Sequence, residues 1–160
     1  MTFEQEAMAA AVEARMGVAN SAAPLQVFEA RFSTKGIGQS LPLTGASNMI
    51  SVTLLPNCDL PSASRATVTS LTGSLTPNSA LEPFNVTSAP ALSFEDLAEW
   101  NQTSGVVVLT VGSGGLSAGV EYVVSFWLRN PAEEQDSPDV SVSSFGEVRS
   151  KSLAHTHTHT

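Results

Sequence analysis

Hydrophobic and polar positions alternate with a period of two along most of the chain, which predicts a protein built of β-strands. The pattern is clearest between residues 105 and 145, where β-branched and aromatic residues form short runs separated by Gly, Pro, Asn and Ser. The predicted strands are 25–34, 49–55, 66–72, 84–87, 106–111, 121–128 and 140–145.

About seven short strands with regular turns predict an all-β protein, an antiparallel β-sandwich of immunoglobulin-like or jelly-roll style. The chain has one cysteine, so the disulfide-linked immunoglobulin domain itself is excluded. The segment 81–99 is the least regular. Within it, Ser93 followed by Asp96 resembles a helix capping box and predicts one or two helical turns up to Trp100.

The N-terminal segment has a different period. Apolar residues recur there every three or four positions, and Thr2 is a plausible N-cap, so we expect an amphipathic helix over 2–19. Two interpretations stay open: the helix packs on the β-domain or frays, or it docks into a partner subunit. The apolar positions are Phe3, Ala7, Met8, Ala11, Val12, Met16 and Ala19.

The resulting domain organisation has three parts. Residues 1–20 form the amphipathic helix, residues 21–148 the β-sandwich domain, and residues 149–160 a flexible His/Thr tail. The tail ends in alternating His155, His157 and His159, a pattern typical of a low-complexity end or a cloning tag. Three imidazoles are able to hold a transition metal, but the strict alternation favours the tail interpretation.

Composition narrows the range of partners. Hydrophobic residues make up 42% of the 160 residues and charged residues only 14%, and the formal net charge is −8. An acidic chain without a Lys/Arg cluster is repelled by phosphate backbones and by anionic lipid, so neither nucleic acid nor such a membrane surface is expected as a partner. No apolar stretch approaches the roughly 20 residues of a membrane-spanning helix.

Catalytic chemistry is not expected. Cys58 has no histidine partner outside the last six residues, and its place at the end of a strand indicates a small buried residue. No phosphate-binding loop, dinucleotide fingerprint, nucleophile elbow or zinc-protease motif occurs in the sequence. The chain is therefore expected not to be an enzyme.

Calcium is the one cofactor that the sequence leaves open. Glu133, Glu134, Asp136 and Asp139 fall in one loop, where carboxylate oxygens are able to bind Ca²⁺. They lack the spacing of a dedicated calcium loop, so solvated loop charges are the competing interpretation. Asn85 and Asn101 begin two N-glycosylation sequons, which would carry sugar if the protein is secreted.

An ordered set of motifs resembles a tandem repeat module of very large surface proteins of algae and other protists. The motifs are Ile37-Gly-Gln-Ser, Asn48-Met-Ile-Ser-Val-Thr-Leu, Thr67-Val-Thr-Ser-Leu-Thr-Gly, Gly105-Val-Val-Val-Leu-Thr-Val, Ala118-Gly-Val-Glu-Tyr-Val-Val, Asn130-Pro-Ala and Ser137-Pro-Asp-Val. The likeness covers residues 25–145 and implies an extracellular β-module, with no catalytic residues to transfer. A single copy and the N-terminal helix depart from that pattern.

These observations favour a non-catalytic structural or adhesion module that acts through protein–protein assembly, with residues 2–19 as the docking element. A carbohydrate-binding module, with or without calcium, is one alternative. An accessory subunit of a larger intracellular complex is another. The expected location is extracellular or at the cell surface as part of a larger parent, or intracellular if Met1 is the natural start.

Overall fold

The protein is all-β and antiparallel. The computed structural model describes residues 14–19 and 21–145, and in these ranges the chain forms strands and contains no helix. The strands are β1 (Phe32–Gln39), β2 (Ser47–Pro56), β3 (Arg65–Thr69), β4 (Phe84–Ala89), β5 (Leu97–Asn101), β6 (Val106–Thr110), β7 (Tyr122–Arg129) and β8 (Ser141–Phe145). Among the described residues there is accordingly no helix long and apolar enough to cross a membrane.

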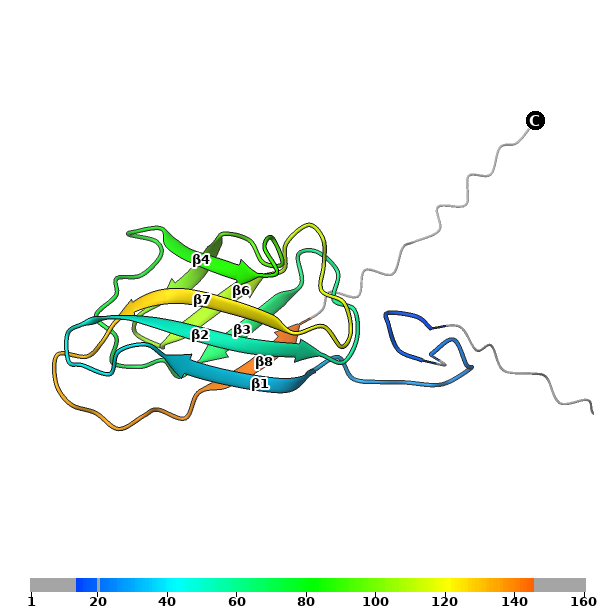
Figure 1. Cartoon of the computed structure of the whole chain (residues 1–160), viewed down its shortest axis with the longest axis horizontal. Coiled ribbons are helices and arrows are strands. Elements are labelled where there is room, and N and C mark those ends of the chain that lie inside the picture. Colours follow the sequence, from blue (N-terminus) through cyan, green and yellow to red (C-terminus); the bar gives the residue numbers. More distant parts are fainter. Residues whose placement is uncertain (1–13, 20, 146–160) are drawn as a thin grey trace, which may run out of the picture.

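The strands form one curved sheet that nearly closes into a barrel (Figure 1). The sheet order is β1-β2-β7-β4-β5-β6-β3-β8. The second strand therefore pairs with the seventh, the third with the sixth and the fourth with the fifth. The β4–β5 pairing is short, joining Phe84 to Ala98 and Asn85 to Leu97, so it divides the sheet into two halves that face each other across the core.

Period-two alternation produces that core, because every second residue of each strand points inward. In β2, Ile50, Val52 and Leu54 are buried while the residues between them are partly exposed. Aromatic rings fill the space where the two halves join. Phe84 stacks on Trp100 with ring centroids 5.6 Å apart and meets Phe126 at 5.5 Å.

Three sequence predictions need correction or restriction. The part of the predicted helix 2–19 that the structure describes, residues 14–19, is a turn, because Met16 and Gly17 have positive φ angles of 51° and 69°. The rest of that helix and the tail 149–160 lie outside the described residues. The helical turn predicted before Trp100 is the strand β5, because pairing with β6 outweighs a local capping signal.

The first predicted strand begins seven residues later than the expected range 25–34. Its partner β2 ends at Pro56, which lies opposite Phe32 and has no N–H to donate. Residues 24–31, here called the arm, therefore continue beyond the barrel without a partner strand (Figure 1).

Neighbouring positions in β7 provide a test of the core. We expect Phe126→Ala to lower the free energy of unfolding by about 3–5 kcal/mol, because the side chain is buried against Phe84 and leaves a cavity. Trp127→Ala, on the outer face of the same strand, is the matched control and should cost about 1 kcal/mol or less. Urea denaturation measures both, and equal losses would contradict the assigned register of β7.

Candidate functional site

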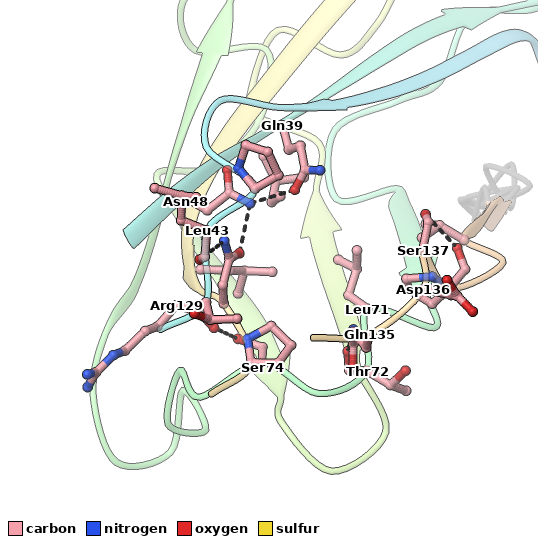
Figure 2. A pocket seen from close by; sticks show the side chains of 18 of the residues that line it. Gln39, Leu43, Asn48, Leu71, Thr72, Ser74, Arg129, Gln135, Asp136 and Ser137 are labelled. Carbon is pink, nitrogen blue, oxygen red and sulfur yellow. Dashed lines mark hydrogen bonds between the residues drawn. The ribbon is translucent and has the colours of Figure 1, made fainter. Parts of the chain in front are cut away.

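A cavity of about 350 Å³ opens at the end of the barrel where β1 and β7 terminate (Figure 2). Its walls are the end of β1, the loop between β1 and β2, the end of β7 and the loop 131–140 that leads toward β8. The apolar part of the lining includes Ile37, Leu43, Ile50, Leu71, Leu128 and Val140.

A buried asparagine fixes one wall of this cavity. Asn48 is almost fully buried, and its amide nitrogen donates to Gln39 Oε1 and Asn130 Oδ1, both at 2.8 Å (Figure 2). Its amide oxygen accepts from the backbone N–H groups of Ser40 at 3.1 Å and Leu41 at 2.9 Å. Every strong hydrogen-bonding group of the side chain is thus satisfied, which a buried amide requires.

Asn130 extends the network into the loop between β1 and β2. Its amide nitrogen donates to the carbonyl oxygens of Leu41 and Leu43 at 2.8 Å. Arg129 donates from Nε to Gly45 O at 3.0 Å, and its side chain points away from the cavity (Figure 2). Arg129 and Asn130, at the end of β7, therefore anchor the loop between β1 and β2.

One feature of the sequence indicates this network: a polar residue, Asn48, occupies a position that faces the core. Asn48 shares a face with Ile50, Val52 and Leu54, so the period-two pattern places it in the core. Gln39, Asn48 and Asn130 lie in three separate motifs of the resemblance, and the structure brings them together. Sequence reasoning did not identify them because spacing along the chain does not reveal which strand ends meet.

The loop 131–140 carries the four residues predicted to bind calcium. Glu133, Glu134 and Asp136 line the cavity, whereas Asp139 is not part of the lining. In the described ranges 14–19 and 21–145, no three His, Cys, Asp or Glu side chains form a group suited to a metal ion. Calcium binding by these carboxylates stays a prediction.

The barrel is incompletely closed between β1 and β8. Two hydrogen bonds join these edges near the start of β1: Lys35 Nζ donates to Val142 O at 3.2 Å, and Ser144 Oγ donates to Ala30 O at 3.4 Å. No backbone-to-backbone hydrogen bond joins β1 to β8 in the part of the chain described here. Farther along β1, the gap opens into the cavity at Ile37, Gly38 and Gln39; we call this stretch the open seam.

Ile37 shows the consequence of that gap. It lies opposite the fully buried Val52 and so belongs to the core face, yet it is 45% exposed. Leu43, in the neighbouring loop, is also exposed. The open seam thus presents apolar side chains beside an unpaired strand edge.

The arm lies at the opposite end of β1. Asn57 fastens its last residues, accepting from Arg31 N at 2.8 Å and donating to Glu29 O at 2.9 Å. The turn before it is anchored by Asp59, whose backbone N–H donates to Met16 O at 2.7 Å. Between these anchors, Leu25 is 98% exposed and Val27 is 90% exposed.

Cys58 is fully buried in the core. Burial raises the pKa of its thiol above the usual value, and the neighbouring carboxylate of Asp59 raises it further. A buried, protonated thiol is a poor nucleophile. The side chain therefore serves packing, as the sequence indicated.

The tryptophans separate into two environments. Trp100 is buried and donates from Nε1 to Thr76 O at 3.0 Å. Trp127 is 58% exposed on the outer face of β7, opposite Met49 of β2. Both sequon asparagines are exposed: Asn85 in β4, and Asn101 at the end of β5, where its Oδ1 accepts from Ser104 N.

No protein-family model, curated protein or solved structure matches this chain.

Removal of the Asn48 amide tests the network. We expect Asn48→Ala to lower the free energy of unfolding by about 2–3 kcal/mol, because the buried side chain loses its hydrogen bonds to Gln39, Asn130 and the loop between β1 and β2 and leaves a cavity. The amide of Leu41 should also exchange faster with solvent. Ser47→Ala, at an exposed neighbouring position, is the control and should change stability by about 0.5 kcal/mol or less. Equal stability of the two variants in urea would refute a structural role for Asn48.

Proposed function

We propose that this chain is a non-catalytic structural module that assembles with other protein chains through exposed strand segments. The observation that carries the proposal is the arm, which holds Leu25 and Val27 almost fully in water between two anchored ends. Burying each such side chain is favourable by about 1.5–3 kcal/mol, so an anchored apolar segment of this kind supports a docking role. We therefore propose residues 24–31 as a docking element, in addition to the segment 2–19 favoured by the sequence, most of which lies outside the described residues.

The finer architecture belongs to the same proposal. The second strand pairs with the seventh, the third with the sixth and the fourth with the fifth, and the first and last strands are adjacent. This order favours a jelly roll over the immunoglobulin-like alternative. Jelly rolls often serve as rigid assembly units, but the fold alone does not define a function.

We further propose a place at the cell surface or in a filament, within a larger parent. Support comes from the low share of charged residues, 14%, and from two exposed sequon asparagines. Gln39, Asn48 and Asn130 come from three of the motifs that resemble the repeat module, and their side chains are hydrogen-bonded to one another. This contact supports interpreting the three motifs as parts of one structural unit.

Sedimentation velocity on the intact chain tests the assembly function. We expect the sedimentation coefficient to rise with protein concentration, since the arm and the open seam are available on every monomer. A chain that stays monomeric from micromolar to near-millimolar concentration would argue against assembly between copies.

A second candidate function is carbohydrate binding on the outer face of β7. The exposed indole of Trp127 is able to stack on the apolar face of a sugar, with Arg129 two residues farther along the same face. The buried position of Trp100 weakens this alternative, because the row of exposed aromatics typical of such platforms is reduced to one ring.

Glycan-array binding measures this alternative directly. If it is correct, Trp127→Ala should abolish the signal while leaving the urea midpoint nearly unchanged, and a calcium-assisted form would also lose binding in EDTA. Binding that persists in Trp127→Ala would place any sugar site elsewhere.

A further inference from the structure

We propose that Asn85 carries an N-linked glycan whose first sugar packs on the exposed indole of Trp127, so that the glycan covers the outer face of β4, β5 and β7. The inference rests on the proposed place of the chain at the cell surface, since N-glycans are added to secreted chains. The group that covers this face is thus one that the chain itself carries covalently.

Asn85 lies between two exposed apolar side chains on neighbouring strands. It pairs with Leu97 of β5. On its other side, Val86 pairs with Phe126 of β7, and the two strands lie side by side (Figure 1). The next residues along these antiparallel strands are Asn85 and Trp127, which are therefore neighbours.

These three side chains share the outer face of the sheet. Val86 and Phe126 are buried, and side chains alternate along a strand, so Asn85 and Trp127 point outward. Trp127 is 58% exposed and Leu97 is 57% exposed. The solvated face of an antiparallel sheet is ordinarily polar, so two large apolar side chains on either side of one asparagine indicate a covering group.

The asparagine in the middle of this row begins a complete sequon. Asn85, Val86 and Thr87 form Asn-x-Thr, and both Asn85 and Thr87 are exposed. The Asn85 side-chain amide makes no hydrogen bond to any residue that the structure describes. Transfer from a lipid-linked oligosaccharide pyrophosphate joins Asn85 Nδ2 to C1 of the first sugar, breaks the bond from C1 to the pyrophosphate and releases one amide proton.

The first sugar is within reach of the indole. Side chains that are neighbours on one face of a sheet have Cβ atoms about 4.5–5.5 Å apart, which is within the span of one pyranose ring. The apolar C–H face of that ring packs on the indole of Trp127 and leaves the sugar hydroxyls in water. Met49 of β2 lies opposite Trp127, so the sugar approaches from the β4 side.

The second sequon provides a comparison within the same chain. Asn101 pairs with Val106 of β6, and its Oδ1 accepts from Ser104 N at 3.0 Å. Farther along that part of the sheet, Thr69 of β3 pairs with Ser141 of β8, and their hydroxyl groups are 2.7 Å apart. A glycan at Asn101 therefore meets a more polar surface without an indole.

A glycan at Asn85 restricts where partners bind. It makes the outer face of β4, β5 and β7 bulky and polar, which leaves assembly to other surfaces such as the arm. It also occupies the indole of Trp127. The carbohydrate-binding alternative and this inference therefore make opposite predictions for the glycosylated chain.

Single-sequon variants of the intact chain test the site. Thr103→Ala leaves Asn85 as the only sequon, and Thr87→Ala leaves Asn101 as the only one. Each variant is secreted from a eukaryotic host behind a signal peptide and is also made in a bacterial host that adds no N-glycan. Peptide mass spectrometry should find sugar on Asn85 in the secreted Thr103→Ala variant.

Iodide quenching of tryptophan fluorescence then measures the cover on Trp127. The chain has two tryptophans, and Trp100 is only 3% exposed, so iodide reaches Trp127 alone. The glycan at Asn85 should lower the quenching constant by about half, because the sugar removes one face of the indole from solvent. The glycan at Asn101 should leave it unchanged.

Thermal unfolding supplies a second measurement of the same contact. The glycan at Asn85 should raise the Tm of the Thr103→Ala variant by about 2–4 °C relative to the bacterial product. Adding Trp127→Ala to this variant should remove that gain, because the two groups act through one contact. The variant with sugar only at Asn101 is the control and should show no dependence on Trp127.

Absence of sugar at Asn85, with or without sugar at Asn101, overturns the inference. Sugar at Asn85 with unchanged quenching, or a gain in Tm that persists with Trp127→Ala, also overturns it. Sedimentation velocity measures assembly separately. A chain that carries the Asn85 glycan on Trp127 but stays monomeric would overturn assembly between copies and leave this inference standing.

Discussion

The incomplete pairing of β1 with β8 is the constraint on which the other features of this structure depend. The remaining strands pair along their edges, and the sheet curves until its first and last strands face each other. Two side chains, Lys35 and Ser144, join the edges at one end, and nothing equivalent joins them beyond Ile37. The cavity, the exposure of Ile37 and the free backbone edge all follow from that gap, since an edge without a partner leaves backbone groups unpaired.

A polar network fixes the loop beside this gap. Asn48 is held in the core by Gln39 on β1, by Asn130 after β7 and by the loop between β1 and β2. Such a network is stable only when all of its members are satisfied, and here both the donors and the acceptors of Asn48 have partners. The loop that borders the seam is thereby fixed to the sheet.

The sequence predicted the strands better than the site. Runs of β-branched and aromatic residues located β2, β3, β4, β6, β7 and β8, because their alternation reflects burial that the local sequence records. The pattern is wrong where pairing depends on distant segments: it predicts a helical turn where β5 lies, and it extends the first strand into the arm. The Asn48 network could be suspected from a polar residue on an apolar face, but its partners become neighbours only through the sheet order. The open seam has no local signature, since it reflects a missing pairing between the two ends of the fold.

Hydrogen exchange at single residues tests the central claim most directly, because it reports on the free edge of β1 itself. In dilute protein, the amides of Ile37 and Gln39 should exchange fast, while that of Gly38, which points toward β2, exchanges slowly. Protection of the Ile37 and Gln39 amides in dilute protein, to the level of Gly38, would contradict it.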